Sequence, residues 1–255
     1  MLLEVEDVRK HFRGLRALDG VSLSVQESEI LGLIGPNGSG KTTLLNIVSG
    51  VLRPTSGRVR IDGRSTADLP VHRIAQLGVG RTFQQIRLFP QLSVAENVEV
   101  GAVARGLGRP GIARMPRLLA RTRLIDQAAL PAGALAYGQQ RRAEIARALA
   151  GAPRLLLVDE PAAGMNEAES DALLRSLRAI RDEEGCAMLI VDHDLRLIMR
   201  LCDRVHVLAE GKTIAEGTPA EVRRDPAVVA AYIGEPVTGS AAPAADEHDP
   251  QKEET

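Results

Sequence analysis

Residues 35 to 42 have the types and the spacing of a loop that binds phosphate. They read Gly35-Pro36-Asn37-Gly38-Ser39-Gly40-Lys41-Thr42. The glycines allow a tight turn whose backbone N–H groups point at an anion, and the helix that follows adds the positive end of its dipole. Lys41 supplies charge for the β- and γ-phosphates, the Thr42 hydroxyl is placed to ligate Mg²⁺, and Thr43 can add a hydrogen bond to phosphate. The sequence therefore predicts a site for a nucleoside triphosphate.

Two adjacent carboxylates, Asp159 and Glu160, follow an apolar run at residues 155–158. Parallel sheets bind ligands at the carboxyl ends of their strands, so we expect this pair to face the phosphates. Asp159 would hold magnesium through its water shell, and Glu160 would polarise the water that attacks the γ-phosphate. The alternative is a helix N-cap, because Asp followed by Glu-Pro is also a good helix start.

The elements that must position these residues follow from the apolar runs. Residues 2–5, 21–25 and 30–34 are short apolar segments separated by polar turns, which predicts an antiparallel β-layer beside the nucleotide-binding strand. The runs at 155–158, 187–191 and 204–208 alternate with helical stretches such as 167–183. That pattern is typical of a buried parallel sheet covered by helices, so the predicted fold class is α/β.

A helical subdomain is predicted at about residues 88–150. No strand pattern occurs there, and segments 94–104 and 117–129 have helical patterns separated by the Gly/Pro-rich break 106–110. We expect it to be inserted into one domain of residues 1–235. Residues 236–255 are rich in Ala, Pro, Asp and Glu, which predicts a disordered tail. The subdomain's arginines are interpreted as a solvated face, and the alternative is that they contact lipid headgroups or a partner.

Composition excludes several classes of protein. A formal net charge of −1 and 2% aromatic residues argue against a nucleic-acid surface. No apolar run approaches the roughly 18 residues that span a bilayer, so we expect any membrane role to come through a partner. Cys186 and Cys202 lack the spacing of a metal or redox site and are interpreted as small apolar residues of a reduced cytosolic protein.

A third segment decides the classification. It opens a helical pattern that runs to residue 150 and reads Leu135-Ala136-Tyr137-Gly138-Gln139-Gln140-Arg141-Arg142. Together with the phosphate loop, the Asp159-Glu160 pair, Gln84 and His193, its order and spacing resemble an ABC transporter ATPase over nearly the whole ordered chain. The resemblance implies a P-loop ABC ATPase core, with the antiparallel β-layer and the inserted helical subdomain.

The signature segment departs from the family's usual sequence. Ser-Gly-Gly is usual where this chain has Ala136-Tyr137-Gly138, so a hydroxyl contact to the γ-phosphate is missing and backbone N–H groups must contribute more. This variant resembles the ATP-binding subunits of branched-chain amino acid importers. So do Arg141-Arg142, the segment at 160–164 and the ending at 216–219.

The resemblance also implies roles for single residues. Phe12 would stack on adenine, with core packing as its alternative. Gln84 would reach Mg²⁺ or the attacking water and report occupancy to the transmembrane partner. His193 would hydrogen-bond the γ-phosphate, whereas its alternative is a surface histidine paired with Asp192 and Asp194. The full set is Lys41, Gln84, Glu160 and His193 for catalysis, Thr42, Gln84 and Asp159 for Mg²⁺, and Phe12, Gly35 to Thr43 and Ala136, Tyr137, Gly138 and Gln139 for ATP.

Partners are implied in the same way. Residues 163–166 fall where the family has a loop that crosses to a second subunit, so we expect a homodimer or a heterodimer with two ATP molecules between head-to-tail protomers. Transmembrane permease subunits would place the chain at the cytoplasmic face of the membrane, with a substrate-binding protein as an indirect partner. No nucleic acid is expected.

Other functions remain open. The stretch between Gln84 and Leu135 is shorter than expected for this importer group, so a urea or short-amide importer or a lipopolysaccharide exporter is an alternative. A second alternative is an ABC ATPase that acts without a permease. A third is a regulatory module that no longer hydrolyses ATP, although Lys41, Asp159, Glu160 and His193 are all present.

Overall fold

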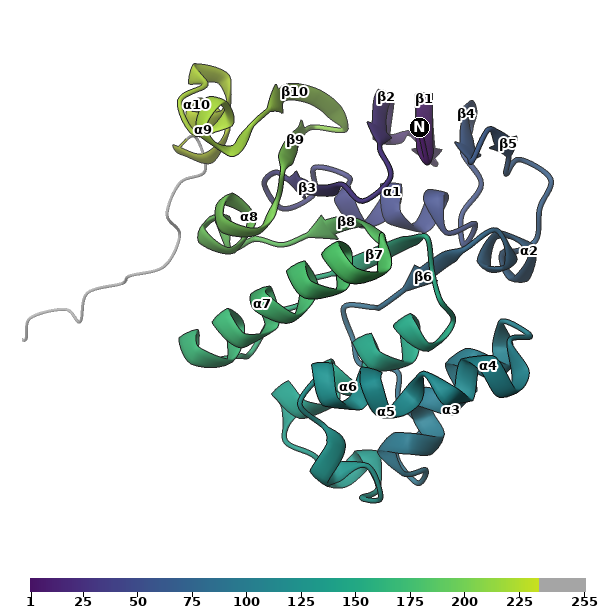
Figure 1. Ribbon diagram of the computed structural model, residues 1–255. Coiled ribbons are helices and arrows are strands. Elements are labelled where there is room, and N and C mark those ends of the chain that lie inside the picture. The colour runs from purple at the N-terminus through teal and green to yellow at the C-terminus, as the bar shows by residue number, and fades with distance from the viewer. Residues whose placement is uncertain (234–255) are drawn as a thin grey trace, which may run out of the picture.

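Two β-sheets and a group of helices make up residues 1–233, the part of the chain that the computed structural model describes. Figure 1 shows the antiparallel sheet and helix α1 above a larger sheet, with helices α3 to α6 below it. The α/β class is confirmed. The tail predicted for residues 236–255 lies outside the described residues.

The four-stranded sheet has the order β2-β1-β4-β5 and is antiparallel throughout. Its strands are β1 (Leu3–Phe12), β2 (Leu15–Val25), β4 (Ser56–Ile61) and β5 (Arg64–Ser65). The predicted antiparallel layer is therefore confirmed, but its first two strands form a much longer hairpin than the apolar runs indicated. Their tip is exposed, and its two apolar residues, Phe12 and Leu15, do not continue a period-2 apolar pattern.

The six-stranded sheet has the order β10-β9-β3-β8-β7-β6. Neighbouring strands are parallel except for β10, which pairs antiparallel with β9. The strands are β3 (Ile30–Ile34), β6 (Val79–Arg81), β7 (Leu155–Asp159), β8 (Ala187–Val191), β9 (Arg204–Ala209) and β10 (Lys212–Gly217). Its central strands are the predicted buried parallel ones.

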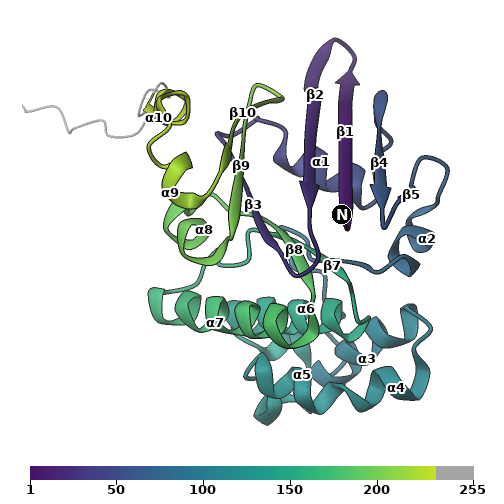
Figure 2. The same cartoon turned by 45° about the horizontal axis from the view of Figure 1, so that its top comes forward.

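The central strands are apolar on both faces, because each face packs against a different layer. Leu31 and Leu33 of β3 point toward α1 (Lys41–Val48) and the antiparallel sheet, whereas Ile30 and Ile34 point toward the helices of the other side. Strands β7 and β8 divide in the same way, as the alternation of their side chains requires. Helix α1 therefore lies between the two sheets, as Figure 2 also shows.

The inserted subdomain contains α3 (Val94–Ala104), α4 (Gly108–Ala113), α5 (Met115–Arg121) and α6 (Tyr137–Ala150). The prediction of α3 is confirmed residue for residue. The single helix predicted at 117–129 is wrong: α5 ends at Arg121, Arg123 has a left-handed φ of 56°, and a separate short turn follows at Ile125–Gln127. Helix α4 begins inside the expected break, because glycine and proline are tolerated in a first turn.

The remaining helices cover the sheets and their edges. They are α2 (Val71–Gln76), α7 (Glu167–Glu184), α8 (Leu195–Leu201), α9 (Pro219–Val222) and α10 (Pro226–Ile233). Three arginines of the subdomain, Arg114, Arg117 and Arg121, form ion pairs with Glu183 and Glu184 at the end of α7. These arginines therefore link the subdomain to α7 rather than forming a purely solvated face.

Within residues 1–233, none of the helices has both the length and the apolar character needed to cross a membrane. Cys186 and Cys202 are free and buried, which confirms their interpretation as small apolar residues. Burial raises the pKa of the Cys186 thiol to about 12, so it stays protonated at neutral pH.

The buried side-chain amide of Asn97, in α3, binds the segment that leads into the subdomain. Asn97 Nδ2 donates to the carbonyls of Phe89, Leu92 and Ser93 at 2.9, 3.3 and 3.0 Å, and its Oδ1 accepts from the Phe89 N–H at 2.8 Å. Asn97 is fully buried, so water cannot replace these bonds. Asn97 therefore fixes residues 89–93 on the helix that follows them.

We expect Asn97→Ala to lower the free energy of unfolding by about 1–3 kcal/mol, because it leaves a buried N–H and carbonyls unsatisfied. Urea unfolding measures the change. Gln91→Ala, at an exposed amide of the same loop, is the matched control and should stay within about 0.5 kcal/mol of the parent chain. Equal losses in both variants would contradict the role of Asn97.

Candidate functional site

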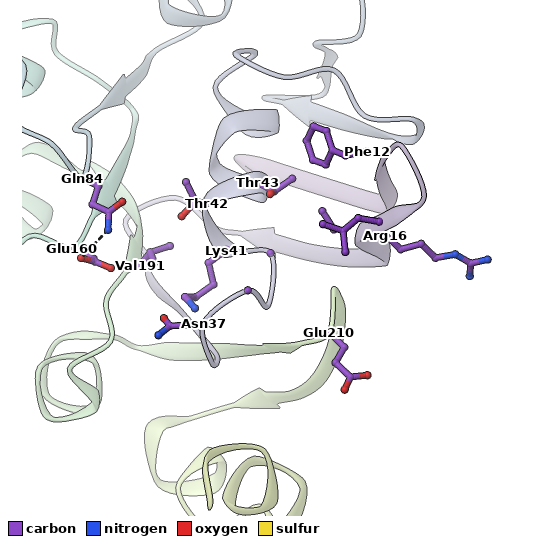
Figure 3. Close-up of a pocket in the computed structure, with 14 residues that line it drawn as sticks. Phe12, Arg16, Asn37, Lys41, Thr42, Thr43, Gln84, Glu160, Val191 and Glu210 are labelled. Atoms are coloured by element: carbon purple, nitrogen blue, oxygen red, sulfur yellow. Dashed lines mark hydrogen bonds between the residues drawn. The ribbon is translucent and has the colours of Figure 1, made fainter. Parts of the chain in front are cut away.

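A cavity of about 590 Å³ opens beside the phosphate loop, between the β1–β2 hairpin and the carboxyl ends of β3, β7 and β8. Figure 3 shows the residues around it. Its lining is Phe12, Leu15, Arg16, Ala17, Asn37, Gly38, Gly40, Lys41, Thr42, Thr43, Gln84, Glu160, Val191 and Glu210. Segments from the first and the last thirds of the chain meet here.

The phosphate loop has the predicted strand–loop–helix context, since β3 ends at Ile34 and α1 begins at Lys41. Gly40 has φ +104°, and a Cβ there would lie 2.5 Å from the Ala17 carbonyl oxygen, so glycine is required. Lys41 Nζ donates to the carbonyls of Gly35 and Pro36 at 2.6 and 2.8 Å. The ammonium is therefore held over the loop, where phosphate would bind.

Glu160 has a strained backbone at the floor of the cavity. Its φ is +48°, which is unfavourable for a residue with a Cβ, and its N–H donates to the Val191 carbonyl at 2.8 Å across the sheet. Strain of this kind persists where the surrounding structure imposes it, often at functional sites. Here it places the carboxylate at the cavity wall rather than in a helix cap.

Gln84 and His193 both approach the Glu160 carboxylate. Gln84 Nε2 donates to Oε2 at 3.4 Å, and His193 Nδ1 lies 3.7 Å from Oε1. His193 Nδ1 is also 3.7 Å from Asp192 Oδ1, and its side chain is 69% exposed. The structure therefore brings Gln84, Glu160 and His193 together, although His193 does not line the cavity.

Asp159 is the last residue of β7, and it is buried rather than part of the cavity wall. Burial raises the pKa of its carboxyl, while the positive charges of Arg81, Arg141 and Lys41 oppose that shift. A divalent cation nearby would stabilise the ionised form. Thr42, Gln84 and Asp159 all offer oxygen atoms, the ligands that Mg²⁺ prefers, so the side chains present fit this ion.

The ring of Phe12 lies at the side of the cavity opposite Gln84 and Glu160, as Figure 3 shows. It is 42% exposed, which does not fit the core-packing alternative. Lys10 Nζ lies 5.0 Å from the ring centroid. A flat ring with open space beside it is suited to stacking on a base.

The signature residues Ala136, Tyr137, Gly138 and Gln139 do not line this cavity. They form the start of α6, where the Ala136 N–H donates to Gln139 Oε1 at 3.1 Å. The Ala136 methyl group cannot accept a hydrogen bond in return, so half of a capping box is missing, and the Gln139 N–H instead donates to the Ala136 carbonyl at 2.9 Å.

Arg141 is a site residue that the sequence did not identify beyond its place in the signature. Its side chain is fully buried, and its Nη1 pairs with Glu144 at 2.8 Å. It also donates to the backbone carbonyls of Phe83 and Gln84, at 2.6 Å for Gln84. Arg141 thus fixes the backbone of Gln84 from the signature helix.

Five further lining residues, Leu15, Arg16, Ala17, Val191 and Glu210, were also missed. They come from the β1–β2 hairpin, the end of β8 and the turn between β9 and β10. No motif marks them, because only the packing of these segments beside the phosphate loop brings them to the cavity.

Comparison with known proteins gives the family. Residues 18–163 match the family described as ABC transporter, and residues 212–238 match the one described as branched-chain amino acid ATP-binding cassette transporter. The chain is 40% identical over 250 residues to the high-affinity branched-chain amino acid transport ATP-binding protein BraF of Pseudomonas aeruginosa, covering 92% of this chain and 98% of that protein. It is 35% identical over 240 residues to the lipopolysaccharide export system ATP-binding protein LptB of Haemophilus influenzae, with the same coverage.

Solved structures agree with this assignment. The ADP conformation of MJ1267, an ATP-binding cassette of an ABC transporter, is 30% identical and superposes with a TM-score of 0.83 over 92% of this chain and 99% of that one. The dimeric structure of MJ0796, a bacterial ABC transporter cassette, gives a TM-score of 0.78 at 30% identity, covering 85% and 98%. The chain therefore belongs to the ABC transporter family, as an ATP-binding subunit whose ATP hydrolysis is coupled to transport.

Proposed function

We propose that this chain powers an importer of branched-chain or other hydrophobic amino acids. The proposed cargo rests on one observation. Residues 212–238, a segment outside the ATPase motifs, match the branched-chain amino acid family. Relatives named for the same transport, such as BraF, support it. The chain itself does not contact cargo in this proposal, because its cavity has the chemistry of a nucleotide site.

The geometry supports a mechanism of in-line attack on ATP. Phe12 stacks on adenine, and the loop from Gly35 to Thr43 holds the phosphates through backbone N–H groups and Lys41. Glu160 accepts a proton from the attacking water while the water oxygen bonds to the γ-phosphorus and the bond to the β–γ bridging oxygen breaks, which gives inorganic phosphate and ADP as the leaving group. Gln84 and His193 contact the Glu160 carboxylate on two sides and thereby orient it toward the water and the γ-phosphate.

We infer that the metal is Mg²⁺, held by Thr42 with Gln84 and, through water, Asp159. When bound, it neutralises the charge that develops on the phosphate oxygens. Within residues 1–233 no group of three His, Cys, Asp or Glu side chains could hold a metal by itself. That agrees with an ion that takes most of its ligands from phosphate and water.

A dimer would complete the site. The start of α6 does not line the cavity of its own protomer, so the backbone N–H groups of Tyr137 and Gly138 would serve a nucleotide bound by another subunit. A head-to-tail pair would place two ATP molecules between a phosphate loop and a signature segment. The dimeric MJ0796 cassette supports this arrangement. The second subunit is either another copy or a related chain.

A second hollow suits the permease, which would hold the chain at the cytoplasmic face of the membrane. It measures about 350 Å³ and lies between β6 and the helices α2, α3 and α6. Its lining is mostly apolar: Ala75, Val79, Gly80, Phe89, Val100, Gly101, Ala104, Arg105, Arg147, Ala148, Gly151 and Pro153. We infer that a helical segment of a permease subunit packs here. Phe89 would transmit changes at Gln84 to this permease segment, because Phe89 follows the Gln84 segment in the chain and is half exposed.

The alternative function is export of lipopolysaccharide, which the similarity to LptB supports. The two functions share the ATPase chemistry and differ in the permease. Identification of the permease therefore decides between them.

We expect Glu160→Gln to lower the rate of ATP hydrolysis by about 100-fold or more, because an amide cannot accept the proton of the attacking water. Nucleotide binding should remain, whereas Lys41→Ala should lose it. Phosphate release and binding of a fluorescent ATP analogue measure the two effects. A Glu160→Gln chain that hydrolysed ATP at the parent rate would exclude Glu160 as the general base.

Phe12→Ala should weaken ATP binding by roughly 1–3 kcal/mol, the range for stacking of a base on an aromatic ring. Phe12→Tyr keeps the ring and should bind ATP normally. Calorimetric titration of both variants measures the difference, and equal affinity for all three chains would show that Phe12 does not stack on the base.

Capture of tagged Glu160→Gln from detergent-solubilised native membranes, with ATP and Mg²⁺, should recover a pair of polytopic permease subunits. Ala104→Arg, placed in the hollow, should abolish recovery because the long cation fills it. Val103→Arg, at the adjacent exposed position outside the hollow, should not. Mass spectrometry identifies the recovered chains; permeases of a lipopolysaccharide exporter, or ribosomal or repair proteins, would overturn the importer proposal.

A further inference from the structure

Tyr137 occupies a position that neither the ATP cavity nor the core explains. It is the first residue of α6, its side chain is 46% exposed, and it stands where the usual signature has glycine. A large ring that is half in water contributes little to stability by burial. Its contacts therefore point to another use.

The ring lies directly on Gly164, in the loop of residues 160–166. A Cβ at Gly164 would be 3.0 and 3.1 Å from Cε1 and Cδ1 of Tyr137, so the ring and this backbone are already in contact. Gly164 also has φ +73°, which disfavours any side chain there. This loop begins with the strained Glu160. The tyrosine thus packs on the segment that presents the general base.

The hydroxyl of Tyr137 reaches a second segment through Arg141. Arg141 Nη2 donates to Tyr137 Oη at 3.4 Å and to the Gln84 carbonyl at 2.6 Å. Arg141 is fully buried and is fixed on its other side by Glu144. One guanidinium nitrogen therefore connects the tyrosine to the backbone of Gln84.

A neighbouring contact joins the start of α6 to the start of α7. A Cβ at Gly138 would lie 3.3 Å from Glu169 Oε1 in α7. Glu169 Oε2 accepts from the Asn166 N–H at 3.1 Å, which closes the 160–166 loop at its far end. The start of α6 therefore touches this loop at Gly164 and the helix that follows it.

We propose that Tyr137 is a positioning residue that couples the 160–166 loop to Gln84 through Arg141, so that the signature turn, the general base and Gln84 move as one unit within a protomer. This proposal rests on the proposed ATPase mechanism. In it, the ring holds the loop and the hydroxyl holds Arg141. A shift of Gln84 on nucleotide binding is then passed to Glu160 through the backbone as well as through the direct contact between their side chains.

Hydrogen exchange of the nucleotide-free chain tests the link without requiring hydrolysis. In the loop, Glu160, Ala163 and Met165 have amides bonded to the carbonyls of Val191, Glu160 and Ala162. Tyr137→Ala should make amides of the 160–166 loop exchange several times faster, because the ring no longer covers Gly164. Tyr232→Phe in α10, the other tyrosine of the chain, is the control and should leave that loop unchanged.

Turnover tests the coupling. Tyr137→Phe keeps the ring and removes the hydroxyl, so we expect kcat to fall roughly three- to tenfold, as for the loss of one hydrogen bond, with KM for ATP and the melting temperature unchanged. Tyr137→Ala should lower kcat further. A merely structural role would lower the melting temperature, and direct contact with nucleotide would raise KM.

Unchanged exchange in Tyr137→Ala overturns the proposal, and so does a parental kcat in Tyr137→Phe. A rise in KM without a loss of kcat also overturns it. A parent chain that does not hydrolyse ATP would instead count against the proposed function, and the exchange data would still decide whether Tyr137 holds the loop.

Discussion

The buried guanidinium of Arg141 is the constraint on which the arrangement of the site depends. A buried charge is stabilised by acceptors, and here the Glu144 carboxylate and the carbonyls of Phe83 and Gln84 accept from the two Nη atoms, while Nε has no partner among the described residues. These carbonyls belong to the segment that leaves the parallel sheet, whereas Arg141 belongs to the helical subdomain. The need to satisfy one charge therefore aligns the subdomain with the sheet and fixes where Gln84 enters the cavity.

Two further charged side chains of α6 make hydrogen bonds to the same segment. Arg147 donates to the Arg87 carbonyl, and Glu144 accepts from the Arg87 N–H at 3.2 Å, so residues 83–87 are held along α6 at several points. Arg81 and Arg87 both lie over the Phe83 ring, with their guanidinium carbons 4.8 and 4.1 Å from its centroid. The segment that contains Gln84 is thus held by directional bonds rather than by apolar burial.

Most of the fold was predictable because its signals are local. Continuous apolar runs located the parallel strands, and the capping box of Ser93 and Glu96 begins α3 at the predicted residue. The predicted helix at 117–129 was wrong because its composition is helical throughout, while Thr122 and Arg123 leave the helix through a backbone conformation that composition does not encode. The exposed tip of the β1–β2 hairpin was missed because it has no apolar period, although pairing between the strands extends to Phe12 and Leu15.

The sequence by itself determined the chemistry. The spacing from Gly35 to Thr42 requires a phosphate loop at a helix start, and the order of Gln84, the signature, Asp159-Glu160 and His193 predicted the family. Only the tertiary structure decided how these groups meet. It places Gln84 and His193 on either side of Glu160, leaves Phe12 open to the cavity, and lays Tyr137 on Gly164 beside Arg141. The physical reason is that a motif is fixed by covalent spacing, whereas contacts between residues far apart in the chain depend on how sheets and helices pack and on which buried polar groups must find partners.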